Sequence, residues 1–443
     1  MGRLNSTDFD VIVAGGGPSG LIAGTAAARL GAKTIVIERD GFLGGMATGG
    51  WVAQFFFFFL KDVLQVVRGI PEEFTERIKK AGGATGFEKY ILNAVGLYTE
   101  PLTVTGFPFD PEIAKMVADE LLLDAGAHPL FHSTVVDVLM EGNRVCGVVV
   151  EGVGGRREIR GKVIVDATGD GVAAKKAGAQ VRGEEDEFRK VRQPCTLVFR
   201  VAGCDVPQLW ALPREEKQRI VRRGLETGEL PWASLAFFRN PSTNEGFSLM
   251  SRISGRDILD DEDLSQALIE GRQQIKRIVE FLRREIPGFS KCKISGIAPR
   301  LGLRESRTIA GRYTLTEDDI FSSRSFEDAV VLGGGYVDIH EANGPGIYLK
   351  ELDRPFEIPL RCSFPASIEG LVITGRTIST TRVAIAATRG MGTMMALGQA
   401  AGTVAALAAK KGVLPTDVPV KEVQSMLRKN GAVITEADAR ARS

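Results

Sequence analysis

The stretch FDVIVAGGGPSGLIAGTAAARLGAKTIVIE, residues 9–38, decides the fold of this chain. Its apolar start predicts a buried strand, and a glycine turn then leads into an alanine-rich helix from Pro18 to about Leu30. A second apolar run follows Gly31 and predicts another strand. Strand, helix and strand in this order indicate a βαβ unit of a parallel sheet.

The turn between the first strand and the helix carries the spacing G-x-G-x-x-G at Gly15, Gly17 and Gly20. Gly15 permits the tight turn, Gly17 lets backbone N–H groups approach a pyrophosphate, and Gly20 allows the helix to pack closely on the strand. Glu38 ends the second strand 18 residues past Gly20, where a carboxylate binds ribose hydroxyls. This context favours a dinucleotide site over a glycine turn without a ligand.

The composition of the 443 residues is that of an ordinary globular chain, with 44% hydrophobic and 25% charged residues. By length it predicts two or three domains. Because 56 Lys and Arg face 55 Asp and Glu, nothing supports wholesale binding of nucleic acid or of an anionic membrane. We therefore expect no nucleic-acid partner.

Two uncharged stretches raise the question of a membrane span. The first contains QFFFFFL (54–60), but it is rich in glycine and meets Lys61 and Asp62. The second, residues 391–409, is long enough but consists mostly of small residues around a central Gln399. We expect no membrane span. The five cysteines form no C-x-x-C pair and the N-terminus lacks an apolar signal core, so a cytoplasmic location is expected.

The middle of the chain differs in character from its two ends. From about 186 to 329 the sequence becomes more charged and predicts longer helices, whereas apolar strands return near 330 and 371. We interpret residues 186–329 as an inserted α+β substrate domain. Residues 1–185 and 330–443 would then form the dinucleotide-binding domain.

The stretch GFLGGMATGG (41–50) indicates which dinucleotide is bound, because a nicotinamide dehydrogenase has little use for it directly after the ribose-binding acid. With it, the chain resembles FAD-dependent oxidoreductases of the fumarate reductase and succinate dehydrogenase flavoprotein superfamily, and is most similar to the bacterial family called FAD-dependent oxidoreductase. The other motifs that carry the resemblance are VDATGDG (165–171), PRLGLRESRTIAGRYTLTEDD (299–319), YVDIHEANGPG (336–346), LVITGRTIS (371–379) and RGMGTMMALGQAAG (389–402).

The resemblance implies an α/β fold with a Rossmann-like FAD-binding domain of the glutathione-reductase type. It implies that residues 44–48 lie along the isoalloxazine, that the strand containing Val136 touches the adenine, that Gly169 lies near the ribose and that residues 375–376 lie by the pyrophosphate. The 41–50 region offers no histidine for covalent attachment, so we expect dissociable FAD. The expected cofactor-binding residues are Gly15, Gly17, Pro18, Ser19, Gly20, Glu38, Arg39, Gly44, Gly45, Met46, Ala47, Thr48, Val136, Ala167, Thr168, Gly169, Gly375, Arg376, Gly392, Thr393 and Met394.

The helix that begins near Met391 has glycines at its start. Gly390 and Gly392 would aim free backbone N–H groups at the flavin pyrimidine ring, where the helix dipole favours the negative charge of the reduced flavin. The same residues also fit an Ala-Gly helix that merely packs tightly on a sheet. We expect both to hold.

His340 is the histidine singled out for chemistry, since it lies in a glycine-rich loop that the resemblance places near the flavin. Two roles stay open for it, proton transfer to or from the substrate and a hydrogen bond that braces the loop. His128 and His132 are expected to be structural. No metal site is expected.

Arginines supply the other catalytic candidates. Arg361 and Arg382 could orient a substrate carboxylate or stabilise an anionic reduced flavin. Arg382 stands where many relatives carry the histidine of a His-Glu-Ala step, which leaves the substrate open. Residues 304–307 (RESR) fit either an ion-paired helix start or the active site.

The phenylalanine run begins five residues after Gly49 and Gly50, so we expect it to wall the cavity beside the isoalloxazine. Strand-like alternation would send some rings into the core and others toward the cavity, where they exclude water. A wholly buried segment is the alternative.

These observations predict an oxidoreductase that transfers a hydride between a small polar organic substrate and flavin N5, in a direction left open. The electron donor or acceptor is unidentified, because no second nucleotide domain and no C-x-x-C pair is present. Three alternatives remain: an ene-reductase like fumarate reductase, an RNA-modifying flavoprotein similar to folate-dependent tRNA methyltransferases, and a flavin-binding protein without a substrate. The oligomeric state is open.

Overall fold

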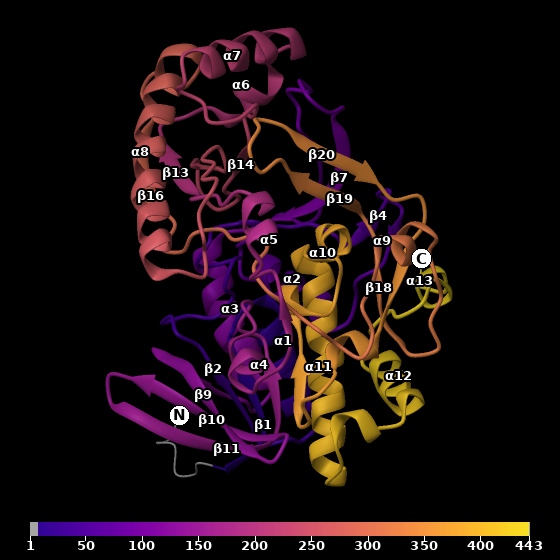
Figure 1. Ribbon diagram of the computed structural model, residues 1–443. Helices are drawn as coiled ribbons and strands as arrows, with labels where there is room; N and C mark the ends of the chain where they lie inside the picture. The colour runs from indigo at the N-terminus through magenta and orange to yellow at the C-terminus, as the bar shows by residue number, and fades with distance from the viewer. Residues whose placement is uncertain (1–7, 443) are drawn as a thin grey trace.

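The computed structural model describes residues 8–442, apart from the side chains of residues 186, 189 and 190. Its main sheet has the strand order β8-β2-β1-β11-β10-β9, and β22 pairs with β11 (Figure 1). Strands β8, β2, β1, β11 and β22 run parallel, whereas β10 and β9 are antiparallel additions. The strands span Asp8–Ala14 (β1), Thr34–Ile37 (β2), His128–Leu130 (β8), Ser133–Glu141 (β9), Arg144–Gly152 (β10), Gly155–Asp166 (β11) and Leu371–Ile373 (β22).

Helices cover this sheet, and two of them cross without intervening side chains. A Cβ on Gly398 would lie 2.2 Å from the carbonyl oxygen of Ser19, and one on Gly402 would lie 2.1 Å from that of Ala23. The small residues therefore let α11 press against α1. Helices of this body are α1 (Pro18–Arg29), α2 (Ile70–Lys80), α3 (Pro111–Asp124), α4 (Val172–Lys176), α10 (Arg382–Thr388), α11 (Met391–Lys411), α12 (Val420–Lys429) and α13 (Glu436–Arg440).

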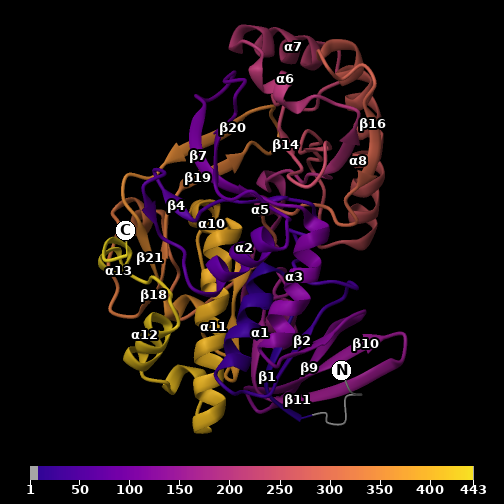
Figure 2. The ribbon, with the colours of Figure 1, turned by 180° about the vertical axis from the view of Figure 1, so that it is seen from behind.

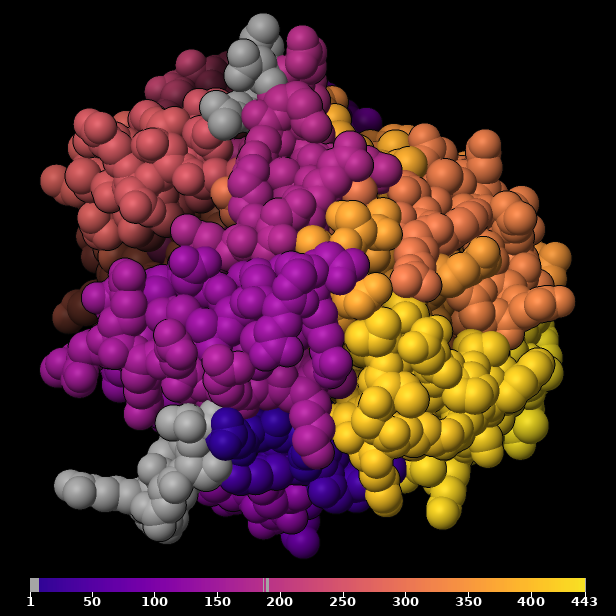
Figure 3. Space-filling view, turned by 60° about the horizontal axis from the view of Figure 1, so that its bottom comes forward, coloured from indigo at the N-terminus to yellow at the C-terminus, as the bar shows by residue number. Residues whose placement is uncertain are grey.

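Helix α11 is long and apolar enough to cross a membrane, but 89% of its apolar window is buried inside the protein. It serves as a core helix, as the Ala-Gly packing interpretation expects. In Figure 3 the C-terminal residues (yellow) lie beside segments from the first half of the chain (indigo and magenta), so distant parts of the sequence complete one body.

A second hydrophobic core lies at the opposite end of the molecule from β9 and β10 (Figures 1 and 2). Its buried residues come from 195–301, joined by Trp51, Ala53 and Val95. The boundaries expected at 186 and 329 stay a prediction. The elements of this region are β13 (Phe199–Ala202), β14 (Phe237–Arg239), β15 (Gly246–Ser248), β16 (Lys293–Ile297), α5 (Asp186–Val191), α6 (Val206–Ala211), α7 (Arg214–Glu226) and α8 (Asp261–Glu285).

Small two- and three-stranded sheets complete the fold. The hairpin of β19 and β20 reaches toward the second core in both ribbon views (Figures 1 and 2). These elements are β3 (Gln54–Phe55), β4 (Phe59–Leu60), β5 (Leu64–Gln65), β6 (Glu88–Leu92), β7 (Leu102–Pro108), β12 (Val181–Arg182), β17 (Thr308–Ile309), α9 (Glu317–Phe321), β18 (Ala329–Gly333), β19 (Tyr336–His340), β20 (Ile347–Glu351) and β21 (Phe356–Pro359), with 3-10 turns at Leu360–Ser363, Gly375–Thr377 and Pro415–Asp417.

The phenylalanine run divides into two groups, but strict alternation is wrong. Phe55 and Phe58 are fully buried in the main core. Phe56 and Phe57 instead join a separate cluster around Tyr336, whose ring centroid lies 4.6 Å from that of Phe57. Phe57 has a left-handed φ of 69°, which ends the short strand β3 and turns the chain between β3 and β4.

Candidate functional site

The glycine turn after β1 is closed on one side and open on the other. Gly15 has a φ of 101°, and a Cβ there would lie 2.4 Å from the carbonyl oxygen of Ala167. A Cβ on Gly17 would meet no atom within 4 Å. No side chain of the described residues caps helix α1, whose first residue is Pro18. The first-turn N–H groups thus remain available to an anion.

Two further segments surround this helix end. Gly375 has a φ of 80°, and a Cβ there would lie 3.7 Å from Cβ of Ser19. The hydroxyl oxygens of Ser19 and Thr374 lie 2.6 Å apart. From the other side, a Cβ on Gly45 would come within 2.8 Å of Cα of Gly17. The start of α1 and the segments around Gly45 and Gly375 form what we call the cradle.

Glu38 lies buried beside the cradle at the end of β2, 3% exposed. Its Oε2 accepts a hydrogen bond from the backbone N–H of Gly16 at 2.8 Å, and its Oε1 accepts one from that of Asp40 at 3.0 Å. Nη2 of Arg300 lies 2.5 Å from Oε1, and the same guanidinium pairs with Asp40. Sequence reasoning missed Arg300, although it lies in the PRLGLRESR motif.

The cradle fits a dinucleotide. Its uncapped helix end with an open glycine suits a pyrophosphate, and the buried Glu38 suits ribose hydroxyls. The strand that holds Val136 starts beside Glu38, since the N–H of Ser133 donates to the Glu38 carbonyl at 3.1 Å. Val136 is half-buried on β9 and Arg39 is exposed.

Several expected cofactor residues have structural partners of their own. The Thr168 hydroxyl lies 2.7 Å from Oδ1 of Asp166 and accepts from the Val172 N–H at 3.0 Å. Asp166 is fully buried, and this burial raises its pKa. The Thr48 hydroxyl donates to the Leu43 carbonyl at 2.5 Å.

Arg376 forms an ion pair with a neighbouring carboxylate, that of Asp170. Its Nη2 lies 2.5 Å from Oδ1 of Asp170, and its Nη1 donates to the Leu303 carbonyl at 3.2 Å. Burial opposes ionisation of Asp170, but Arg376, Ser306 and Arg39 together outweigh it and lower the pKa of this carboxyl. Gly169 lies directly against the Arg376 guanidinium, since a Cβ there would be 3.6 Å from its Cζ.

The expectation of a free N–H at Gly392 is wrong. That group donates to the Phe56 carbonyl at 3.3 Å, and a Cβ on Gly390 would lie 2.1 Å from the ring of Phe57. The phenylalanine run crosses the start of α11 because Phe57 turns the chain there. Thr393 in the same first turn is fully buried, and its hydroxyl has no partner among the described residues. Met394 is 5% exposed.

A second group of polar side chains lies where β19 meets the second core. His340 is 6% exposed, and its backbone N–H donates to Oε1 of Gln193 at 2.9 Å. Its Nδ1 lies 3.4 Å from Nη1 of Arg252, and its Nε2 lies 3.4 Å from Oδ1 of Asp338. Nη2 of Arg389 lies 2.7 Å from Oδ2 of Asp338. We call these residues, together with Arg304, the His340 cluster.

The contacts of His340 define its tautomer. A guanidinium can only donate, so Nδ1 accepts from Arg252 and the proton of the neutral ring resides on Nε2. Burial and the charges of Arg304, Arg389 and Arg252 hold the pKa of His340 well below 6.5. In this geometry Nε2 of His340 is a hydrogen-bond donor and the lone pair of Nδ1 is taken by Arg252. The proton-accepting role expected from the sequence would need one ring nitrogen with a free lone pair. The catalytic role of His340 stays a prediction.

The structure does not bring Arg361 to the His340 cluster. Arg361 is exposed, pairs with Asp328 at 2.9 Å and lies over the Tyr313 ring at 4.9 Å. Arg382 begins α10, with its guanidinium 3.4 Å from Oε1 of Glu305. Sequence reasoning missed Arg252, Gln193, Asp338 and Arg389, although Asp338 lies in the motif at 336–346 and Arg389 in the motif at 389–402.

The segment 300–307 joins the cradle to the His340 cluster. The expected ion-paired helix start is wrong, because its side chains diverge and β17 begins at Thr308. Arg304 donates to the Pro194 carbonyl at 2.6 Å, while Ser306 donates to the Gly169 carbonyl at 3.1 Å. Glu305, which is buried, accepts from the Gln193 N–H at 2.5 Å. The segment lies between the two groups and contacts both.

Comparison with known proteins places these features in a family. A family model described as FAD dependent oxidoreductase matches residues 10–427. A thiamine thiazole synthase of Pyrobaculum calidifontis is 31% identical over 238 residues, which are 47% of this chain and 80% of that protein. One of Sulfolobus acidocaldarius is 28% identical, over 48% of this chain and 80% of that protein. A geranylgeranyl bacteriochlorophyll reductase-like protein from Thermoplasma acidophilum has a TM-score of 0.49 and 14% identity, over 98% of this chain and 87% of that one.

Proposed function

This chain belongs to the family of FAD dependent oxidoreductases, and from that premise we propose that it transfers a hydride between a small polar organic substrate and its FAD. One observation carries the proposal. The segment 300–307 touches the cradle through Arg300 and Leu303 and the His340 cluster through Arg304 and Glu305. A substrate at the cluster would therefore lie beside a flavin whose dinucleotide part occupies the cradle.

In this proposal FAD supplies the redox chemistry and the protein supplies the groups that bind it. FAD, when bound, supplies a hydride acceptor or donor at N5. The N–H groups at the start of α1 would hold the pyrophosphate, and Glu38 would hold the ribose. The loop at residues 44–48 contains Gly, Met, Ala and Thr, which offer no side chain for covalent attachment, so the FAD is dissociable.

At the His340 cluster, the protein binds and shields the substrate. The Nε2–H of His340 donates to a polar atom of the substrate, with Arg252 fixing the ring from the other side. Trp232, whose ring lies 5.3 Å from that of His340, excludes water from this face. The electron donor or acceptor that completes the turnover is a separate molecule, and the protein works in the cytoplasm without nucleic acid.

We also propose the type of the FAD-binding domain, the superfamily of the chain and a second candidate reaction. Parallel strands followed by the antiparallel pair β9 and β10 support a FAD-binding domain of the glutathione-reductase type. The order of the sequence motifs supports membership of the fumarate reductase and succinate dehydrogenase superfamily and a bacterial origin. The three arginines of the His340 cluster favour, as a second candidate, an ene-reductase that runs the hydride transfer toward the substrate.

The test is an anaerobic screen of the FAD-loaded protein. Alcohols, amines and organic acids are mixed singly with the oxidised protein, and unsaturated acids with the dye-reduced protein, while the flavin absorption band is followed. We expect one class to bleach or restore the band. Failure of every compound would favour a flavin-binding protein without a substrate, and retention on RNA at physiological salt would favour the RNA-modifying alternative.

A further inference from the structure

Two arginines of the His340 cluster have no carboxylate partner in the part of the chain that the structure describes. Arg252 is 6% exposed, and its Nη2 donates only to the carbonyl oxygens of Glu341 and, at 3.2 Å, Gly346. Its Nε is buried without a partner among the described residues. Arg304, partly buried, donates from Nη1 to the Pro194 carbonyl and, at 3.0 Å, to the Thr196 hydroxyl. Across residues 8–442, no ion pair joins either guanidinium to an acid.

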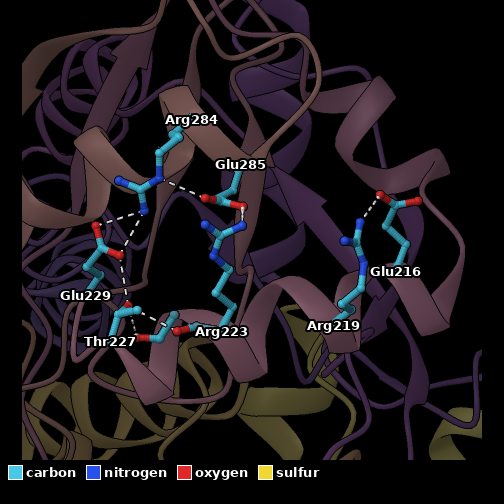
Figure 4. Close-up of polar contacts among 8 residues, drawn as sticks. Glu216, Arg219, Arg223, Thr227, Glu229, Arg284 and Glu285 are labelled. Atoms are coloured by element: carbon cyan, nitrogen blue, oxygen red, sulfur yellow. Dashed lines mark hydrogen bonds and ion pairs between the residues drawn. The ribbon is translucent and has the colours of Figure 1, made fainter.

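The arginines around them are all paired. Arg389 has Asp338 at 2.7 Å, Arg382 has Glu305 at 3.4 Å, and Arg192 has Asp257 at 2.9 Å. Even at the surface, Arg284 lies between Glu229 and Glu285, each 2.8 Å away, in a network in which Arg223 also reaches Glu285 (Figure 4). Arg252 and Arg304 therefore stand out from the other arginines of the chain that lie near them.

Burial of an unpaired charge is unfavourable, since neither water nor a counter-ion then solvates it. Burial lowers the pKa of both guanidinium groups to about 10. The carboxylate of Glu341 attracts the Arg252 charge without forming an ion pair with it. This carboxylate instead accepts a hydrogen bond from the Gly346 N–H at 3.1 Å. Asp338, whose carboxylate contacts His340, already pairs with Arg389. The cluster thus carries excess positive charge.

The position of the two arginines fits a substrate group. Arg304 follows Leu303, whose carbonyl accepts from Arg376 at the cradle. Arg252 lies over the Trp232 ring at 5.4 Å and beside His340. The charges of Arg252 and Arg304 act on one another, so an anion bound at the cluster would be attracted by both cations, beside the Trp232 ring and the Nε2–H of His340. A planar carboxylate accepts from such forked donors in a fixed orientation.

We propose that the guanidinium groups of Arg252 and Arg304 bind a carboxylate of the substrate, so that the enzyme acts on a small organic acid. That the bound acid is a substrate rests on the proposed function, whereas binding of the carboxylate does not require turnover. His340 contributes twice in this arrangement: its Nε2–H faces the bound anion, and its Nδ1 holds the Arg252 guanidinium in place.

The experiment measures binding without chemistry. The midpoint of thermal unfolding of the FAD-loaded protein is followed against malonate, against malonamide as an uncharged analogue, and against sulfate, with sodium chloride keeping ionic strength equal. We expect saturable stabilisation by malonate alone. Arg304→Met and Arg252→Met should each weaken malonate binding at least tenfold, whereas Arg284→Met, a matched change at a paired arginine, should leave it unchanged.

Two further variants keep the test decisive if a methionine variant fails to fold. Arg304→Lys and Arg252→Lys retain the charge but lose the forked geometry, and each should bind malonate more weakly than wild type. Equal effects of malonate and malonamide, equal effects of malonate and sulfate, or unchanged malonate binding in all variants would overturn the proposal. Malonate binding without reduction or reoxidation of the flavin by any acid would instead overturn the hydride-transfer function and leave the carboxylate site standing.

Discussion

Nη2 of Arg300 lies 2.5 Å from Oε1 of Glu38, although 262 residues separate them in sequence. Glu38 ends the second strand of the main sheet, whereas Arg300 follows the last strand of the second core. The pair therefore ties Glu38, the acid expected to bind the ribose, to the other half of the molecule. Because the same guanidinium pairs with Asp40, Arg300 offsets part of the negative charge of two carboxylates beside the cradle.

This pair leads to the first prediction. Arg300→Met should lower the free energy of unfolding by about 3 to 5 kcal/mol, since it leaves buried Glu38 without its cation. Glu38→Gln should weaken FAD binding by about 1.5 to 3 kcal/mol for each charge-assisted ribose hydrogen bond lost. Urea unfolding and FAD titration measure the two. In the double variant the stability loss should be smaller than the sum, and strict additivity would show that the two residues do not interact.

The second prediction concerns the state of the cofactor. The purified protein should be yellow, and it should release intact FAD into the supernatant on acid or heat precipitation, because the loop at 44–48 offers no side chain for attachment. Colour that stays with the precipitate would contradict this expectation.

The third prediction uses the split of the phenylalanine run. Phe55→Ala and Phe58→Ala should each lower the free energy of unfolding by about 3 to 5 kcal/mol, because both rings are fully buried in the main core. At Phe57 the backbone is left-handed, so Phe57→Gly should be more stable than Phe57→Ala by about 1 kcal/mol. At Phe55, within β3, the order should reverse. The same order at both positions would contradict the left-handed turn.

The fourth prediction concerns pH and His340. Its pKa is well below the ordinary 6.5 because of burial and the three neighbouring arginines. The unfolded chain therefore binds a proton that the folded chain rejects, and stability must fall as the pH drops below 6.5, by up to about 1.4 kcal/mol per unit. Above pH 6.5 this contribution is constant.

To test this, the single variant His128→Asn is compared with the double variant that carries His128→Asn and His340→Asn. His128 is replaced because burial and Arg157 lower its pKa too, which gives a slope of the same sign. Urea unfolding at pH 5, 6, 7 and 8 should show a shallower acid slope for the His340 variant. Parallel curves would mean that His340 titrates normally in the folded protein.

The sequence alone determined the nucleotide-binding half of the fold. Gly15, Gly17 and Gly20 between an apolar strand and a helix allow little other than a βαβ turn, because only glycine tolerates the close backbone approach at Ala167. The acid at the end of the next strand and the Ala-Gly helix α11 follow from equally local patterns. Such signals are readable because the reason for each residue type lies within a few positions of it.

Only the tertiary structure decided the rest of the site. The sequence singled out Arg361, which lies at the surface with Asp328, and passed over Arg252, which contacts His340 from 88 residues away. A charged residue on a loop has no periodicity to mark it, and whether it meets a carboxylate depends on how the two cores pack. The paired N–H of Gly392 was equally hidden, because it arises from a contact with Phe56, which lies far away in the chain.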